Sequence, residues 1–261
     1  MLSILLALYV GAFLLGSIPV GYLVAKARGI DIRTVGSGNI GATNVTRALG
    51  HKTGYAVFLV DVLKGLIPGL VARVLFPPDI WSYNDAPPNW FFWGWPVQIL
   101  WFLAGIAAFL GHMFCPWLGF KGGKGIATGL GALLAAAPTT ALCSFGVFLA
   151  FLFLTHYVSL SSLIAAVALP IFGLTLPGEP RELVAFYVPL SLLIFYKHRD
   201  NIKRLKAGTE SKFSFRSKDA PGREHIPGLQ ETEEFKPGHE DIPGLQHGYI
   251  AGLPETEKGD S

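Results

Sequence analysis

A series of long apolar runs constrains this sequence more than any other feature, because runs of this kind are solvated by lipid rather than by water. The first run, Leu2 to Ala25, can cross about 30 Å of hydrocarbon, and without a preceding basic residue or a small-residue cleavage site it predicts a retained span. We predict an all-α, polytopic membrane protein of about seven transmembrane helices, or six, since the two runs that meet near Pro138 are short. The further runs lie near residues 54–76, 97–115, 126–140, 141–155, 158–176 and 183–196.

The composition supports a membrane protein and argues against a soluble globular enzyme. Charged residues make up 15% of the chain, against about 25% in an ordinary soluble domain, and the mean hydropathy is +0.45. The two cysteines, Cys115 and Cys143, lie next to or within apolar runs, which excludes a disulfide scaffold and a thiolate metal site. We expect no metal, no cofactor and no nucleic-acid partner.

Charge along the chain predicts the topology. The loops at residues 26–53, 116–125 and 197–206 are basic and are expected in the cytoplasm, whereas residues 77–96 hold no Lys or Arg and many aromatics, as in an outer loop. The amino terminus is then outside and the carboxyl terminus inside. Residues 1–206 carry a net charge of +8 and residues 207–261 a net charge of −5. We therefore predict a transmembrane domain at residues 1–206 and a disordered, acidic, Gly/Pro-rich cytoplasmic tail at residues 207–261.

The densest polar signal is the segment GSGNIGATNVTRALG at residues 36–50, which follows the first apolar run. Its glycines let backbone N–H groups approach an oxyanion, and Thr43 and Arg47 share one face if the segment is helical. The chain has no G-x-x-x-x-G-K-S/T pattern, so this is not a nucleotide P-loop. The segment either binds a phosphate group or only turns the chain between helices. The candidate residues are Gly36, Ser37, Gly38, Asn39, Gly41, Thr43, Asn44 and Arg47.

A second glycine-rich segment, HMFCPWLGFKGGKGIATG at residues 112–129, precedes another apolar run. Loop amides, two ammonium groups and the start of a helix all attract anions, so the segment suits a second phosphate group. In the alternative reading, Lys121 and Lys124 are topology anchors that reach the lipid headgroups. His112 is expected to be a packed interfacial histidine. The candidate residues are Gly119, Lys121, Gly122, Gly123, Lys124 and Gly125.

Three further clusters carry polar groups near membrane-spanning runs. Ser159, Ser161 and Ser162 can bind a ligand, but we favour hydrogen bonds to their own helix or a neighbouring one. In residues 197–210, polar side chains spaced three apart can share one helical face that points toward the loops. Alternatively, this segment is a basic helix that binds anionic lipid. Within the second run, Asp61 and Lys64 are expected to pair, and they either rim a site or lock helices together. The candidates in residues 197–210 are His198, Asn201, Arg204 and Glu210.

The order of five motifs resembles one family. GSIPVGY, GSGNIGATNVTR, GFKGGKGIATGLG, YVSLSSL and HRDNIKRLKAGTE follow one another as in the bacterial PlsY family of acyl-phosphate:glycerol-3-phosphate acyltransferases. The resemblance covers residues 1–212. It implies a seven-helix protein of the bacterial inner membrane, with its active site on the cytoplasmic side, that acts in phospholipid synthesis. Such an enzyme transfers a fatty acyl group from acyl phosphate to the 1-hydroxyl of glycerol 3-phosphate, giving lysophosphatidic acid, and depends on another enzyme that forms the acyl phosphate. One departure is His156, where the family pattern has Arg.

The resemblance also implies roles for the motif residues. Those expected to be catalytic are Ser37, Asn39, Arg47, Lys124 and His198. From their positive charge, we expect Lys124 and Arg47 to stabilise the departing phosphate. The general base is either His198 or a phosphate oxygen of the substrate. Glu210 is expected to stabilise the fold. The residues expected to bind substrate are Gly38, Thr43, Asn44, Gly119, Lys121, Gly122, Gly123, Gly125, Ser162 and Asn201.

Missing motifs narrow the choice of function. The chain has no H-x-x-x-x-D dyad of acyl-CoA-type acyltransferases, no D-x-x-D-G pattern for paired metal-binding carboxylates, and no G-x-S-x-G nucleophile elbow. A serine covalent intermediate is therefore unsupported. The alternative to the acyltransferase is a membrane carrier or channel for an organic phosphate anion, but the chain shows no internal repeat in its apolar part of the kind that transporters have.

Overall fold

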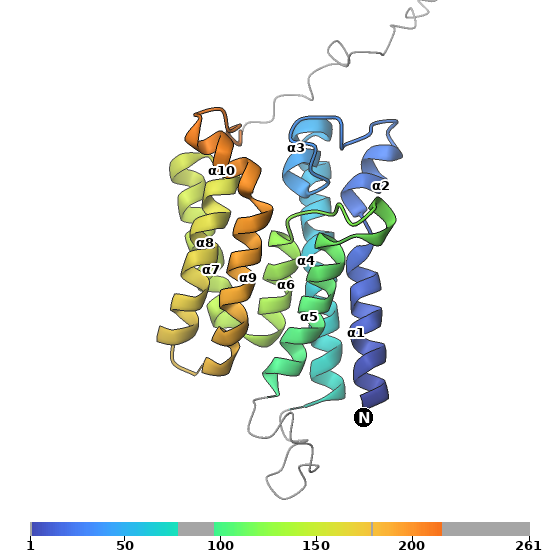
Figure 1. The fold of residues 1–261 in the computed structure, drawn as a ribbon, viewed down its shortest axis with the longest axis vertical. Helices are drawn as coiled ribbons and strands as arrows, with labels where there is room; N and C mark the ends of the chain where they lie inside the picture. Colours follow the sequence, from blue (N-terminus) through green and yellow to red (C-terminus); the bar gives the residue numbers. More distant parts are fainter. Residues whose placement is uncertain (1, 78–96, 179, 216–261) are drawn as a thin grey trace, which may run out of the picture. The chain divides into compact units, whose positions relative to one another are not determined.

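Runs of Leu, Val, Ala and Phe form the long helices of this protein, because backbone groups in hydrocarbon must be satisfied within their own segment. The structure is a computed structural model that describes residues 2–77, 97–178 and 180–215. All regular elements in these ranges are helices (Figure 1), which confirms the predicted all-α class. The long ones are α1 (Leu2–Ser17), α4 (His51–Leu75), α5 (Gln98–Met113), α6 (Ile126–Ala136), α7 (Pro138–Thr155), α8 (Val158–Thr175) and α9 (Val184–Lys197).

Within the described residues, five helical segments are long and apolar enough to cross a membrane. Two further helices at predicted spans are shorter. α6 has 11 residues, and its length of about 16 Å falls short of the hydrocarbon thickness; α9 has 14 residues. The count of seven crossings, or six, therefore stays a prediction. The five segments are Leu2–Lys26, His51–Leu75, Gln98–Leu118, Pro138–Thr155 and Val158–Thr175.

Two element boundaries differ from the sequence-based expectation, and proline explains both. The run 126–140 ends as a helix at Ala136, and Pro138 occupies the first turn of α7, where its missing N–H costs nothing. The run Leu2 to Ala25 is interrupted before Pro19, so that a short helix, α2 (Val20–Lys26), follows α1. At this break the carbonyl oxygen of Ile18 accepts a hydrogen bond of 2.8 Å from Lys64 Nζ.

Glycine lets the helices of the bundle approach closely. The most extensive pairs are α4 with α6, α1 with α5, and α7 with α8. A methyl group added at Gly65 of α4 would collide with the carbonyl of Thr128, and one added at Gly131 of α6 would collide with the carbonyl of Val62. This small-residue packing is typical of membrane helices, which gain little from the hydrophobic effect and associate through close van der Waals contact.

Polar segments from distant parts of the sequence gather at one end of the bundle (Figure 1). They are the loop before α3, α3 itself (Ala42–Leu49), the glycine-rich loop between the short 3-10 helix η2 (Pro116–Leu118) and α6, and α10 (Arg199–Lys206). A second 3-10 helix, η3 (Arg181–Leu183), leads into α9. Lys124 of the glycine-rich loop hydrogen-bonds to Asn201 of α10, and Arg47 of α3 hydrogen-bonds to the carbonyl of Ser211. Three predicted polar motifs thus meet in space.

The chain divides into two units, Met1–Ala220 and Pro221–Ser261, and the second lies outside the described residues, as do the predicted outer-loop residues 78–96. The tail expected from residue 207 starts differently. Residues 207–215 lie against the bundle, because Glu210 and the backbone of Ser211, Phe213 and Ser214 make hydrogen bonds to helix residues or their ends. The prediction for residues 216–261 falls outside the described part of the chain.

Candidate active site

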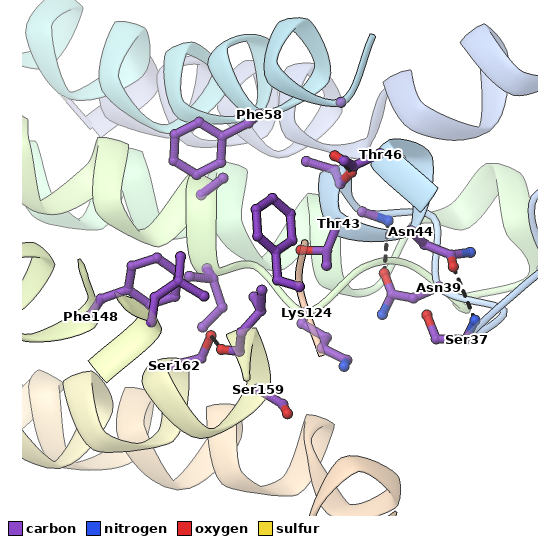
Figure 2. Close-up of a pocket in the computed structure, with 18 of the residues that line it drawn as sticks. Ser37, Asn39, Thr43, Asn44, Thr46, Phe58, Lys124, Phe148, Ser159 and Ser162 are labelled. Carbon is purple, nitrogen blue, oxygen red and sulfur yellow. Dashed lines mark hydrogen bonds between the residues drawn. The ribbon is translucent and has the colours of Figure 1, made fainter. Parts of the chain in front are cut away.

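A cavity of ≈ 450 Å³ opens where the polar segments meet. Its polar wall comes from the α3 segment, the start of α6, α8 and α10, and its apolar wall comes from α4 and α7 (Figure 2). One cavity thus joins hydrogen-bonding and cationic groups to a slot lined by aromatic rings. The lining residues predicted from sequence are Ser37, Asn39, Gly41, Thr43, Asn44, Arg47, Lys124, Gly125, Ser159, Ser162, His198, Asn201 and Glu210; Asp61 and His112 also line the cavity.

The loop before α3 is held in shape by Asn44. This side chain is 1% exposed; its Oδ1 accepts a hydrogen bond from the backbone N–H of Ser37, and its Nδ2 donates to the carbonyls of Ile32 and Val35. Asn39 similarly accepts from the N–H of Gly41. Asn44 lines the cavity, but the loop uses its polar atoms, so its contribution is to orient the backbone around Ser37 (Figure 2).

The end of the first motif is helical, as α3, so the condition for Thr43 and Arg47 to share one face is met, and both line the cavity. The Arg47 guanidinium is partly buried, which lowers its pKa from the ordinary value, while the nearby Glu210 carboxylate opposes that effect. Arg47 Nη2 donates to the Ser211 carbonyl at 3.2 Å. A cation therefore stands at the cavity mouth.

Lys124 is the second cation of the cavity. Burial is the main cause that lowers its pKa to about 8, with Arg204 and Arg47 acting in the same direction against Glu210. Its ammonium donates a hydrogen bond to Oδ1 of Asn201. A partly desolvated ammonium attracts an anionic ligand more strongly than an exposed one, because water competes less for it.

The glycine-rich loop is positioned by the end of α5. The N–H of Gly123 donates to the carbonyl of His112 at 3.0 Å, and a methyl group at Gly123 would collide with the His112 imidazole. The need for glycine at this position is thus explained by packing against His112. The loop in turn carries Lys124 into the cavity.

His198 ends α9 and is 2% exposed. Its Nδ1 lies 2.8 Å from the carbonyl of Ile194, so Nδ1 carries the proton and Nε2 is left as an acceptor. Burial, reinforced by the charge of Lys124, lowers the pKa of His198 to about 4. The imidazole is therefore neutral near pH 7.

Glu210 connects α8 and α10. It accepts hydrogen bonds of 2.6 Å from Ser159 Oγ, 2.6 Å from Asn201 Nδ2 and 2.7 Å from Arg204 Nε. Burial raises the pKa of this carboxyl, but the three donors outweigh it and the net effect lowers the pKa. Asn201 in turn accepts from Lys124, so the carboxylate orients the lysine through one intermediate side chain.

Two of the three serines of the third motif hydrogen-bond to their own helix, whereas Ser159 donates to Glu210. Ser161 Oγ and Ser162 Oγ each donate at 2.8 Å to a carbonyl four residues earlier, those of Tyr157 and Val158. This confirms the structural interpretation of their hydroxyls. Ser162 also lines the cavity, where its oxygen can accept a further hydrogen bond.

The intramembrane pair Asp61 and Lys64 is confirmed as an ion pair of 3.0 Å, with both side chains 4% exposed. Lys64 Nζ also lies 3.3 Å from Nδ1 of His112, and it donates to the carbonyl at the α1–α2 break. Asp61 and His112 line the cavity. The pair therefore has both roles left open by the sequence, because it joins α4 to α5 and the α1–α2 break and also borders the site.

Five of the residues expected to bind substrate do not line the cavity. Gly119 and Lys121 are exposed on the loop, and the predicted binding roles of all five are not supported by direct contact with the cavity. The residues are Gly38, Gly119, Lys121, Gly122 and Gly123.

In the part of the chain that the structure describes, no group of three or more His, Cys, Asp or Glu side chains could hold a metal ion.

The residues that form the apolar wall could not be identified from the sequence. Phe145, Phe148, Leu149 and Leu152 lie along one face of α7 at helical spacing, opposite Phe58 of α4. Because almost every residue of this run is apolar, the pattern alone did not distinguish the cavity face from the lipid face. A smaller cavity of ≈ 80 Å³ shares Phe58, Phe145 and Phe148 and extends among α6, α8 and α9.

Comparison with known proteins agrees with this site. The model of the glycerol-3-phosphate acyltransferase family matches residues 6–208. A glycerol-3-phosphate acyltransferase from Geotalea daltonii is 45% identical over 208 residues, which cover 80% of this chain and 97% of that protein. Crystal structures of PlsY, an integral membrane glycerol 3-phosphate acyltransferase, match in two forms. The glycerol 3-phosphate form has a TM-score of 0.68 and 43% identity, covering 80% of this chain and 96% of the other. The lysophosphatidic acid form has a TM-score of 0.66 and 42% identity, covering 80% and 95%.

These matches confirm the resemblance seen in the five ordered motifs and describe a multi-pass membrane enzyme of phospholipid synthesis. The family model spans all the helices that line the cavity, from α3 to α10. On this evidence the chain belongs to the glycerol-3-phosphate acyltransferase family.

Proposed function

We propose that the protein transfers a fatty acyl group from acyl phosphate to the 1-hydroxyl of glycerol 3-phosphate, giving lysophosphatidic acid. One observation carries the proposal: a single cavity joins the cations Arg47 and Lys124 to an apolar slot between α4 and α7. Both substrates are anions and one has an aliphatic chain, so an enzyme that joins them needs both kinds of wall. The solved relatives in their glycerol 3-phosphate and lysophosphatidic acid forms support the acceptor and the product.

The cavity residues divide into three roles. Arg47 and Lys124 stabilise the negative charge on the phosphate as it departs, and Ser37 with Asn39 orients the hydroxyl or the carbonyl. Thr43, Ser162 and Asn201 add hydrogen bonds to the substrates. The bond between the hydroxyl oxygen and the carbonyl carbon forms, the bond from that carbon to the phosphate oxygen breaks, and inorganic phosphate leaves. The activated donor makes a covalent enzyme intermediate unnecessary.

The proton of the attacking hydroxyl goes to a phosphate oxygen of the substrate. His198 has a pKa of about 4, which makes it a poor proton acceptor at neutral pH. Its acceptor nitrogen, Nε2, instead receives a hydrogen bond and positions a substrate group. The glycine-rich loop contributes through Lys124, which it holds in place against the end of α5.

The protein lies in the bacterial inner membrane with its active site on the cytoplasmic side. The basic loops at residues 26–53, 116–125 and 197–206 support this orientation through the positive-inside bias. With α6 and α9 added to the five long segments, the chain crosses seven times. The amino terminus is then outside, and the acidic tail beyond the bundle is cytoplasmic. Acyl phosphate is supplied by a separate enzyme that forms it.

Purified full-length protein, given acyl phosphate and radiolabelled glycerol 3-phosphate, should yield labelled lysophosphatidate. Acyl-CoA in place of acyl phosphate should yield none, which tests the donor. Sealed vesicles containing the protein should not accumulate glycerol 3-phosphate. Absence of product from folded protein, together with uptake by the vesicles, would support the carrier instead.

A further inference from the structure

Residues 210–215, here called the strap, lie beyond the segment that matches the family model, which ends at residue 208. Glu210 anchors the start of the strap to α8 and α10 through Ser159 and Asn201. Beyond this anchor the strap contributes two aromatic side chains to the cavity, Phe213 and Phe215. The cavity is therefore completed by residues that follow the part of the chain matched by the family model.

The strap is held by both walls of the cavity. On the side of α3 and α4, Arg47 donates to the carbonyl of Ser211, and His51 Nε2 lies 2.7 Å from the carbonyl of Ser214. On the side of α7 and α8, the N–H of Phe213 donates to the carbonyl of His156 at 2.6 Å. Backbone contacts on both sides make the strap a bridge between the two walls.

The two rings of the strap continue the aromatic wall. Phe215 stacks on Phe153 of α7 with ring centroids 5.0 Å apart, and Phe213 lies edge-on to Phe215 at 5.2 Å and to His51 of α4 at 5.8 Å. Such aromatic pairs add specific attraction to their apolar contact. The rings thus close the side of the cavity between the start of α4 and the end of α7.

The position of the rings along the cavity indicates which part of a donor they meet. His51 is the first residue of α4, and Phe153 lies in the last turn of α7. Phe145 lies eight residues before Phe153, about 12 Å deeper along the helix. The strap rings are therefore at the polar mouth, close to Arg47, and the slot around Phe145 is deeper.

We propose that Phe213 and Phe215 are specificity-determining residues that bind the methylene groups next to the reacting carbonyl of the acyl donor. The inference rests on the proposed function, because it assumes that an acyl chain enters this slot with its phosphate toward Arg47 and Lys124. Every straight-chain donor has the same methylene groups near its carbonyl. The strap therefore contributes equally to the binding of short and long donors. It discriminates against donors that branch near the carbonyl, because the two rings leave no room for the branch.

The test compares full-length wild type with Phe213→Ala on short, long and near-carbonyl-branched acyl phosphates. The KM for the straight donors should rise about tenfold at both chain lengths, the change expected from the loss of one ring's apolar contact. The KM for glycerol 3-phosphate should stay unchanged. The kcat/KM for the branched donor should rise relative to the kcat/KM for the straight donors. Phe213→Leu, which retains apolar bulk, should restore most of the affinity for straight donors.

Leu154→Ala is the matched control, because Leu154 is 75% exposed beside Phe153 and does not line the cavity. It should leave both KM values unchanged, and thermal unfolding in detergent checks that each variant is folded. An inactive wild type would contradict the proposed function itself. An active wild type whose folded Phe213→Ala variant keeps the donor KM, or raises both KM values equally, would overturn the role of the strap alone.

Discussion

Lys124→Met should make the protein more stable and nearly inactive at the same time. The ammonium of Lys124 is desolvated in the cavity, and its pKa is about 8 against an ordinary value of 10.5. Burial therefore disfavours the protonated form that the proposed chemistry needs. Met has similar length and no charge to desolvate, so the substitution removes this cost together with the positive charge.

The magnitude follows from the pKa. A difference from 10.5 to about 8 corresponds to about 3 kcal/mol of destabilisation while the lysine is protonated. Loss of the hydrogen bond to Asn201 offsets about 1 kcal/mol of the gain. A net gain of about 2 kcal/mol raises the Tm of a chain of this size by about 4–8 °C. Turnover should fall by about 10²- to 10³-fold, as for other groups that stabilise charge in a transition state.

The dependence on pH gives a second check of the same reasoning. Because the folded pKa is lowered, the unfolded chain holds the lysine proton more tightly than the folded protein does between pH 8 and 10.5. The stability of the wild type should therefore rise across this interval and then level off. In Lys124→Met this rise should be missing.

Thermal unfolding in detergent, followed by intrinsic fluorescence at pH 7 and at higher pH, measures both effects. Lys206→Met is the control, because Lys206 is exposed on α10 and should affect neither stability nor turnover. A lower Tm for folded Lys124→Met at pH 7 would refute the desolvation argument. Turnover close to that of the wild type would remove Lys124 from the chemistry.

Three further changes test other parts of the site. In a plot of kcat/KM against pH, activity should fall near pH 8 in the wild type, where Lys124 loses its proton. In Lys124→Arg this fall should move to higher pH, because the guanidinium stays protonated. A fall that stays near pH 8 in the variant would be due to another titrating group. Gly123→Ala should lower the Tm and raise the KM for glycerol 3-phosphate, because the added methyl group collides with His112 and displaces the loop. The control Gly129→Ala should change neither value. A larger loss of Tm in Gly129→Ala than in Gly123→Ala would contradict this packing. Asp61→Asn should destabilise the protein by about 3–5 kcal/mol in unfolding measurements, because it leaves a buried ammonium unpaired, and an unchanged Tm would show that the pair contributes little.

Much of the fold could be predicted from the sequence, because the thickness of the membrane sets both the length of an apolar run and the length of the helix that it forms. The runs predicted at 158–176 and 183–196 correspond to α8 at Val158–Thr175 and α9 at Val184–Lys197. The interruption before Pro19 was missed, since the apolar run continues through it and prolines also lie inside the uninterrupted helices α4, α8 and α9. The pairing of Asp61 with Lys64 was expected from the cost of a lone charge in hydrocarbon.

The candidate site was predictable only in part. The polar motifs that supply Arg47, Lys124 and His198 could be found, because each combines chemistry-bearing residues with a position at the end of an apolar run. The role of each motif residue could not be predicted, because a polar side chain in a motif can either bind a ligand or hold the backbone in place. Asn44 holds the loop, and Gly123 makes room for the His112 ring.

Local patterns thus determined which segments enter the membrane and which segments carry the chemistry, since hydrophobicity and residue type are properties of short stretches of chain. Tertiary structure alone decided that α3, the loop before α6 and α10 share one cavity, and that Phe213 and Phe215 complete its wall. Those contacts join residues far apart in the sequence. Their formation depends on how closely glycine-bearing helices pack and on where buried polar atoms find partners.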